Sequence, residues 1–503
     1  MLPKKVMQRL IEKTDFKNLT ILTLVNLIIG IYLISTMVLI SKDGTLYINC
    51  ARQFTTHNPI SVISNIETAP GYPFLIFLIH KFIDFFTNNN SLQRWILSAQ
   101  MVSLFSKLVG SVFLYYIGTL LLDQKKFVFW GILILNILPD SAEYGSDALT
   151  EWPHLMFLSI GFLLLLCGAQ YRKSQMFGLA GITTGLGYLV RSESCQLLIY
   201  GGIWLLFNLV RPTNRMKRPK AAVALLLMAV GFIIIAAPYM KIKGYAFPKQ
   251  RMLRLSETSS VSDNVKFVSP TSTAYTGEIM GNKTIMKNIF ETLVYYFVPG
   301  LFIGCWHYFR KQSKRIEQGF FAAAFIILNV MMLLWQQNYQ HFISRRHTLP
   351  LIVFTMFCVP IGMQIISDWI SERTSRGKST TEKNRRNWYY ILIALGVTIC
   401  FVKLIKHTSS QKSGYRDAAM WLNKNTTPED IIAVPDKRIT YYAERNGMEY
   451  SDERQISKRV NYIIRVVKEN DVTPSFGRNI EEKYLTWIDK ENSRKLVIYK
   501  VLR

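Results

Sequence analysis

Long hydrophobic runs separated by polar connections make up most of the chain. A helix needs about 20 apolar residues to cross the hydrocarbon core of a membrane, and most of these runs have about that length. The pattern predicts an α-helical polytopic membrane protein with about eleven spans. The expected spans are residues 19–40, 95–122, 127–138, 152–169, 176–190, 196–210, 221–239, 288–309, 319–335, 347–366 and 388–405.

Two of the outer connections are long, and we expect the first to hold structure of its own. In the first, residues 42–94, the stretch 70–86 reads PGYPFLIFLIHKFIDFF. This stretch is amphipathic and opens with prolines, which predicts a helix lying in the plane of the membrane interface. The second connection, residues 241–287, is rich in Ser and Thr, and we expect it to form a mobile lid over a site.

The composition becomes polar and mixed after the last hydrophobic run. We therefore divide the chain into a transmembrane domain, residues 1–406, and a small α/β domain, residues 407–503. In the second domain the pattern predicts helices at 415–425, 438–445 and 454–469, and strands at 430–434 and 496–502.

The net charge of +27 would suggest a nucleic-acid partner in a soluble protein. Here, however, the Lys and Arg residues gather near the N-terminus and in every second connection. By the positive-inside rule, the N-terminus is cytoplasmic and the C-terminal domain is extracytoplasmic. The first run is too long for a cleaved signal peptide, so we expect it to remain as the first span.

An acidic residue follows the first span directly. Asp43 lies in KDGTLY, and Tyr47 is one helical turn further on, where its side chain can orient the carboxylate. A solvated loop carboxylate is the simpler interpretation, and the residues alone leave both open.

Four more acidic residues follow the third expected span. Asp140, Glu143, Asp147 and Glu151 are three, four and four positions apart, which predicts one face of a helix. No Lys or Arg lies between residues 126 and 172. The face is either simply solvated or an acidic surface for a hydroxyl acceptor, a cation or a general base.

Three arginines break the charge rule on the outer side. Arg191 follows the fifth expected span, and Arg345 and Arg346 precede the tenth, next to His347. A guanidinium matches the geometry of a phosphate group, such as that of a lipid carrier, although pairing with headgroups or with the acidic residues is also open. Lys107, inside the second span, is a further candidate, with a local structural partner as the alternative.

In this order, several segments resemble the GT-C class of integral membrane glycosyltransferases, especially its protein-mannosyltransferase, aminoarabinose-transferase and lipopolysaccharide-core-transferase branch. KDGTLY resembles the acidic motif of the first outer loop, in which the Asp is the catalytic base. ETAPGYPFLI, beginning at Glu67, resembles the Pro-Pro-Leu-Tyr motif of the interfacial helix. Gly71 replaces its second proline, and Ala69 stands where some members have a lysine that contacts phosphate.

Four later segments continue the resemblance over most of the chain. DALTEWP resembles the acidic motif that opens the fourth span, and GLAGITTGLGYLVRSES the Gly-rich fifth span that ends in Arg. SRRHTLP resembles the late Arg-Tyr-Leu-Leu-Pro segment, with His347 in place of Tyr. Residues 415–447 resemble the start of the outer C-terminal domain.

The resemblance implies a glycosyltransferase that moves a sugar from a polyprenyl-phosphate-linked donor to a hydroxyl acceptor on a glycolipid, glycan or protein. Residues 1–406 would then be the catalytic domain, and Asp43 the general base. The acceptor-side or auxiliary residues would be Asp147, Glu151, Glu143, Tyr47 and Glu67. The donor phosphate would be held by Arg191, Arg345, Arg346 and His347. The energy comes from the activated donor, and no ATP-binding motif is present.

No cofactor is required by this scheme, and the six scattered cysteines form no zinc pattern. A Mg²⁺ or Mn²⁺ ion on Asp43, Asp147 and Glu151 remains open. We expect a bacterial inner membrane with the active site on its extracytoplasmic face. The alternative functions are a transporter or flippase of lipid-linked saccharides, whose usual half-to-half repeat is not visible in this sequence, and a ligase or polymerase of lipid-linked glycans.

Overall fold

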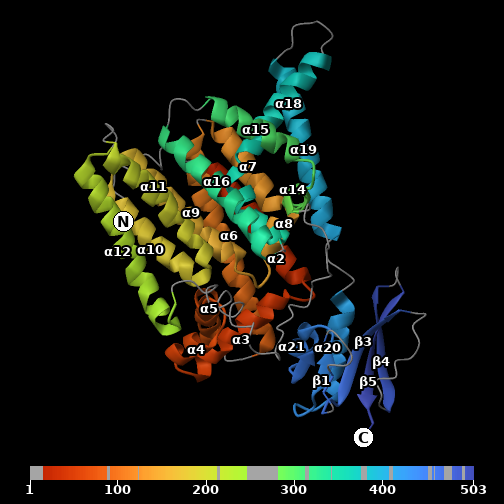
Figure 1. The fold of residues 1–503 in the computed structure, drawn as a ribbon. Helices are drawn as coiled ribbons and strands as arrows, with labels where there is room; N and C mark the ends of the chain where they lie inside the picture. Colours follow the sequence, from red (N-terminus) through yellow and green to blue (C-terminus); the bar gives the residue numbers. More distant parts are fainter. Residues whose placement is uncertain are drawn as a thin grey trace.

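A bundle of helices and a small sheet domain make up the computed structural model (Figure 1). The structure describes residues 15–87, 91–122, 124–211, 216–245, 281–311, 316–340, 343–374, 382–406, 412–450, 456–457, 459–468, 479–489 and 493–502.

Seven of the described helices are long and apolar enough to cross a membrane, or eight if one bent pair counts as a span. They agree with the hydrophobic runs of the sequence, and the chain is an integral multi-pass membrane protein. These helices are α2 (Phe16–Thr36), α6 (Leu92–Leu121), α9 (Glu151–Tyr171), α11 (Gln196–Val210, extended by the 3₁₀ turn Ser192–Cys195), α12 (Arg218–Lys243), α16 (Ile316–Gln340), α19 (Glu382–Lys406) and the bent pair α17 (Arg345–Thr355) and α18 (Cys358–Thr374).

The other expected spans correspond to shorter helices. The runs 127–138 and 176–190 form α7 (Lys125–Ile137) and α10 (Ser174–Val190). The run 288–309 is not continuous, because α14 (Gly281–Thr292) ends before α15 (Val298–Lys311) begins. Between them, Val294 and Tyr295 have left-handed backbone angles, φ 51° and 62°.

The tenth expected span is also broken, since α17 and α18 meet at a bend of 68°. Both runs stay apolar through the break, so hydrophobicity alone overlooks it, but a proline marks the start of the second helix in each case. Pro299 and Pro360 lie in the first turns of α15 and α18. A proline there gives up no helical hydrogen bond, whereas inside a continuous helix it would remove one.

The connection 42–94 folds into three helices, α3 (Lys42–Thr56), α4 (Pro59–Asn65) and α5 (Gly71–Thr87). The helix predicted at 70–86 is α5, which packs on α3 and α6 through Tyr72 and Ile76. Most of the second long connection, residues 246–280, lies outside the described residues, so the predicted lid is untested.

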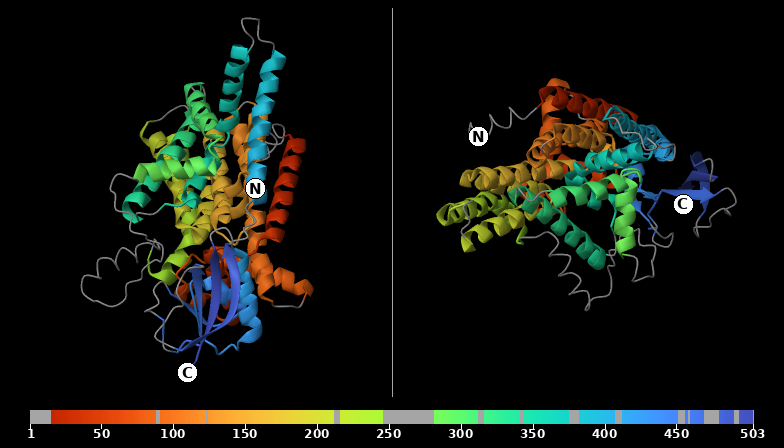
Figure 2. Two further views of the ribbon diagram at one scale, coloured as in Figure 1. Left: turned by 90° about the vertical axis from the view of Figure 1, so that its right-hand side faces the viewer. Right: turned by 90° about the horizontal axis from the view of Figure 1, so that it is seen from above.

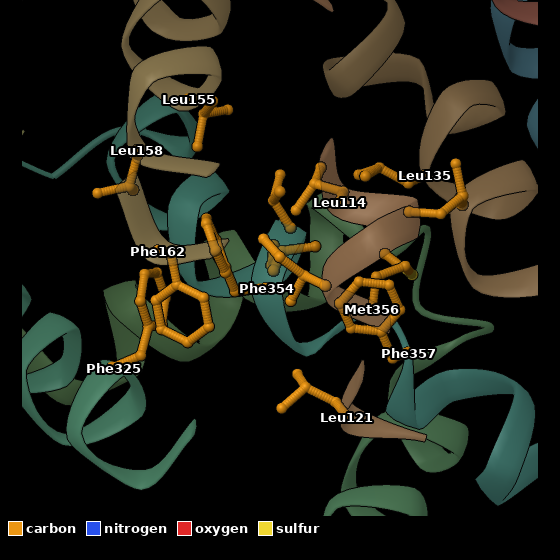
Figure 3. Close-up of a cluster of buried hydrophobic side chains, with 14 of the residues drawn as sticks. Leu114, Leu121, Leu135, Leu155, Leu158, Phe162, Phe325, Phe354, Met356 and Phe357 are labelled. Carbon is orange, nitrogen blue, oxygen red and sulfur yellow. The ribbon is translucent and has the colours of Figure 1, made fainter. Parts of the chain in front are cut away.

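The largest core cluster fixes α9 against α16 and α17. Figure 3 shows Phe162, Phe325 and Phe354 in contact from these three helices. The Phe325 and Phe354 rings stack with centroids 4.2 Å apart, and Phe162 meets both rings at steep angles. This aromatic packing fixes α9 and α17, whose first turns carry charged residues, relative to each other.

The C-terminal domain has a five-stranded sheet with the order β2-β1-β3-β5-β4. β1 pairs in parallel with β2 and β3, whereas β5 pairs antiparallel with β3 and β4. The elements are α20 (Ser413–Asn425), β1 (Ile432–Val434), α21 (Lys437–Ala443), β2 (Gly447–Glu449), β3 (Tyr462–Lys468), β4 (Ile480–Asp489) and β5 (Arg494–Val501). Figure 1 and the left view of Figure 2 place this domain at the end of the bundle where α3, α4 and α5 lie.

One prediction for this domain is wrong. The expected helix 454–469 is replaced by strand β3, whose sequence YIIRVVK is rich in β-branched residues. β3 pairs with β5 along its whole length and with β1 at Tyr462 and Ile463, so the sheet fixes this segment as a strand. Strands β2 and β4 were not predicted.

Candidate active site

Four helix ends meet where the bundle faces the C-terminal domain. Helices α3, α9 and α17 begin there and α10 ends there. Asp43 lies in the first turn of α3, Glu151 is the first residue of α9, Arg191 caps the end of α10, and Arg346 is the second residue of α17. We call these four side chains the arginine–carboxylate cluster.

Within this cluster, Arg346 bridges the two acidic residues. Its Nη1 lies 2.6 Å from Asp43 Oδ2 and 3.8 Å from Glu151 Oε1. Nη1 of Arg191 lies 3.3 Å from the same Glu151 oxygen. Oε1 of Glu151 therefore forms ion pairs with two guanidinium groups, which belong to different helices.

Exposure separates the roles of the two carboxylates. The Glu151 side chain is 6% exposed, whereas that of Asp43 is 47% exposed and that of Arg346 35%. Glu151 Oε2 is buried and has no hydrogen-bond partner among the described residues. Glu151 thus forms the floor of the cluster, and Asp43 and Arg346 are accessible to a ligand.

Arg191 stays positively charged in this setting. Burial by itself would lower the pKa of Arg191, but Glu193, 3.6 Å away, and Glu151 outweigh burial and raise it. Glu193 was not among the predicted site residues. Its only signal in the sequence is an acidic residue two positions after an out-of-place arginine.

Asp147 is not an open carboxylate. Its two oxygens accept the backbone N–H of Ser41 at 3.0 and 3.1 Å, and Oδ1 accepts that of Ala148 at 2.7 Å. Burial raises the pKa of Asp147 to about 6, although these hydrogen bonds oppose the shift. Asp147 therefore anchors the residue that caps α3, two positions before Asp43.

Close packing also fixes the first turn of α3. The Ser41 hydroxyl accepts the backbone N–H of Gly44 at 3.1 Å. A Cβ atom on Gly44 would lie 2.8 Å from Ala148 Cβ and 2.9 Å from its carbonyl oxygen. Only glycine lets this turn approach the connection before α9, and the approach sets the position of Asp43.

Tyr47 lies on α3 one helical turn after Asp43, next to the arginine–carboxylate cluster, as the spacing predicts. Its ring meets that of Tyr72 edge-on, with centroids 5.3 Å apart. Burial raises the pKa of Tyr47 to about 12, and the charges of Glu151 and Asp43 add to the shift. The phenol is therefore neutral, and it lies close enough to both carboxylates to feel their charges.

The acidic residues do not share one helix face, so that prediction is wrong. Pro139 starts a short helix, α8 (Pro139–Tyr144), which stops at Gly145, and α9 begins only at Glu151. Glu143 lies on α8 and Asp147 in the turn that follows.

The two adjacent arginines have different partners. Nη1 of Arg345 lies 3.0 Å from Asp140, and the hydroxyl of Thr292 donates to the same carboxylate at 3.1 Å. Arg345 thus ties α17 to α8 and α14, whereas Arg346 belongs to the arginine–carboxylate cluster.

Three further candidates were predicted from the sequence. His347 uses Nδ1 to interact with the backbone N–H and hydroxyl of Ser344, at 3.1 and 3.0 Å, and so caps α17. Glu67 is exposed in the turn between α4 and α5 and forms no ion pair with a described residue. Lys107 is fully buried on α6, where it donates to the carbonyl oxygen of Asn136 at 3.2 Å.

The residues that would hold a divalent cation do not converge. In the described part of the chain, no three His, Cys, Asp or Glu side chains come together as a metal site requires. Asp43 and Glu151 pair with arginines, and Asp147 is occupied by backbone N–H groups. A metal ion at Asp43, Asp147 and Glu151 stays an untested prediction.

Comparison with known proteins agrees with this architecture. Residues 96–238 match the family described as dolichyl-phosphate-mannose-protein mannosyltransferase. The structure is similar to ArnT from Cupriavidus metallidurans bound to undecaprenyl phosphate, with a TM-score of 0.59 and 12% identity over 95% of this chain and 97% of that one. The chain has the GT-C glycosyltransferase fold. The predicted superfamily and the predicted fold class, a polytopic helical membrane protein with a small C-terminal α/β domain, are thereby confirmed. The number of eleven spans and the cytoplasmic position of the N-terminus stay predictions.

Two archaeal structures are similar to this GT-C protein as well. The apo oligosaccharyltransferase of Archaeoglobus fulgidus gives a TM-score of 0.55 at 12% identity, covering 90% of this chain and 69% of that one. AglB from the same organism, in complex with an inhibitory peptide and a dolichol-phosphate, gives 0.54 at 12%, covering 89% and 69%. No curated protein sequence matches the chain.

Proposed function

We propose that this GT-C protein transfers a sugar from a polyprenyl-phosphate-linked donor to a hydroxyl acceptor, with Asp43 as general base, on the outer face of the membrane. The arginine–carboxylate cluster is the observation that carries the proposal, because it puts an accessible carboxylate beside Arg346 and connects it through Glu151 to the guanidinium of Arg191. The solved neighbours with undecaprenyl phosphate and dolichol-phosphate support a lipid-phosphate donor.

In the proposed step, the acceptor oxygen forms a bond to the anomeric carbon of the sugar. The proton of that hydroxyl passes to the Asp43 carboxylate. The bond between the anomeric carbon and the phosphate oxygen breaks, and its electron pair leaves with the polyprenyl phosphate. Arg346 and Arg191 stabilise the negative charge that develops on this leaving group.

The pairing of Asp43 with Arg346 links the base to the donor. The Asp43 carboxylate accepts a hydrogen bond from Nη1 of Arg346 at 2.6 Å, so this guanidinium occupies one of its oxygens. A donor phosphate competes for the same guanidinium. Arg346 would turn to the phosphate while Glu151 keeps it within the cluster, and Asp43 would be released to accept the acceptor's proton.

Glu151 keeps two like charges close enough to act on one phosphate. Without its oxygen, which lies 3.3 Å from Arg191 and 3.8 Å from Arg346, the two guanidinium groups would repel each other. We therefore assign Glu151 to positioning the two arginines rather than to proton transfer.

The test is sugar transfer in membranes that contain Asp43→Asn. Undecaprenyl phosphate carrying radiolabelled mannose, glucose or arabinose serves as donor, and label on endogenous glycolipid, glycan or protein is measured. We expect the variant to lose at least about 100-fold in rate, as removal of a general base typically does. Glu429→Gln, the same loss of charge on an exposed turn of the C-terminal domain, is the control. Transfer by Asp43→Asn at the wild-type rate would exclude Asp43 as the base.

A further inference from the structure

The C-terminal domain holds the backbone just before Asp43. The N–H of Ile40 donates to the hydroxyl of Tyr442 at 3.1 Å, and the carbonyl oxygen of Ile40 accepts Nη1 of Arg438 at 3.4 Å. Both partners lie on α21. Ile40 is 1% exposed, so water cannot easily replace either hydrogen bond.

Arg438 is itself held rigidly. Its Nε and Nη2 donate to the two carboxylate oxygens of Asp436 at 3.0 and 2.7 Å, a bidentate pair with little exposure. Lys42 adds a contact 2.9 Å from Glu449 on β2 and another 3.7 Å from Asp436. Because Lys42 is half exposed, its ion pairs contribute less than the buried contacts of Tyr442 and Arg438.

The transmembrane domain holds the same segment, residues 40–41, through the next residue, Ser41. The next backbone N–H, that of Ser41, is held by Asp147, and the Ser41 hydroxyl contacts the carbonyl oxygen of Ala148 at 3.4 Å. Two consecutive backbone amides are thus fixed by different domains, immediately before the helical turn that carries Asp43.

We propose that the C-terminal domain is a positioning element for catalysis, in which Tyr442 and Arg438 set the start of α3 so that Asp43 faces Arg346. The inference rests on the proposed function, since it makes Tyr442 and Arg438 act through the base. They do not touch the arginine–carboxylate cluster, so they are positioning residues and not catalytic ones.

The first test compares Tyr442→Phe with Tyr441→Phe in the full-length protein. Tyr442→Phe removes one buried hydrogen bond to Ile40, and we expect kcat to fall by about fivefold with donor KM unchanged. Tyr441 is the neighbouring residue on the same helix, and its buried hydroxyl has no hydrogen-bond partner among the described residues. Tyr441→Phe should therefore keep the wild-type kcat. Equal kcat values for the two variants, or a change only in KM, would overturn the proposal.

The second test needs no activity. Hydrogen–deuterium exchange of the peptide around Ile40 and Ser41 should speed up in Tyr442→Phe and remain slow in Tyr441→Phe. Arg438→Lys should restore part of the kcat that Arg438→Met loses, because it keeps a donor for the Ile40 carbonyl oxygen. Unchanged exchange in Tyr442→Phe would refute the proposed hold on α3.

The proposed sugar transfer and the positioning role of the C-terminal domain can fail separately. A wild-type protein that transfers no sugar from any of the donors would refute the proposed function, and with it the catalytic part of this inference. An active wild type whose Tyr442→Phe variant is equally active would refute the inference alone.

Discussion

Adjacent arginines at the start of α17 should respond to the same substitution in opposite ways. Arg345→Met removes a cation from Asp140, whose side chain is 6% exposed. Loss of a charged partner from a buried carboxylate costs about 1–3 kcal/mol, and we expect the lower half of that range because Arg345 itself is 43% exposed. The contact ties α17 to α8 and α14, so its loss should lower the stability of the protein more than its rate of sugar transfer.

Arg346→Met should do the reverse. Of its two partners, Asp43 is 47% exposed and is solvated by water, and the buried Glu151 keeps Arg191 at 3.3 Å, so the loss costs below about 1 kcal/mol. The variant loses, however, a guanidinium that we assign to the leaving phosphate. Removal of one such stabilising donor typically lowers a rate by about 100- to 1000-fold.

The assay measures both quantities on the same purified samples. Thermal unfolding in detergent should show Arg345→Met a few degrees below the wild type and Arg346→Met close to it. Sugar transfer, measured well below both transition temperatures, should show the opposite order. An Arg345→Met protein that is fully stable but inactive, or an Arg346→Met protein that is active, would refute this assignment of the two arginines.

Two more predictions concern the support of Asp43. Burial raises the pKa of Asp147 to about 6, above its value of about 3.9 in an unfolded chain. The folded state therefore binds this proton more tightly than the unfolded state does. The protein should lose stability as the pH rises from about 4 to 6, by up to about 3 kcal/mol. Thermal unfolding of the wild type should thus occur at a lower temperature at pH 7 than at pH 5, and Asp147→Asn should reduce that difference; an equal difference in both proteins would contradict the shift. Gly44→Ala should push α3 away from Ala148, at a cost of about 1–3 kcal/mol, and slow sugar transfer. Gly202→Ala, whose Cβ would meet no atom within 4 Å, should leave transfer unchanged, and equal rates for the two variants would argue against the packing explanation.

The fold was predictable to the extent that it depends on local hydrophobicity. Every expected span corresponds to a helix or a helix pair, because burial in lipid requires continuous apolar residues whatever their neighbours are. The breaks before α15 and α18 were missed, since a proline in a first helical turn looks the same in sequence as one inside a span. Strand β3 was mistaken for a helix because its partners, β1 and β5, are distant in sequence.

The sequence predicts which residues form the candidate site better than it predicts which of them contact each other. Arg191 and Arg346 stood out because they violate the charge rule, and Asp43 because it follows a span. Nothing in the sequence tells which of two adjacent arginines faces Asp43, since that depends on the rotation of α17 against α3. The occupation of Asp147 by the Ser41 amide is equally invisible, because its partner is a backbone group 106 positions away.

The contact between Ile40 and Tyr442 joins residues that are 402 positions apart in the chain. A ribosome adds about 5 to 20 residues each second, so these two residues are synthesised about 20 to 80 seconds apart. During that interval the membrane helices enter the bilayer while the start of α3 lacks one of its two supports. If Tyr442 and Arg438 position Asp43 as proposed, full activity would consequently appear only after the C-terminal domain has been synthesised and has folded, and a nascent chain released before that point would be inserted but less active.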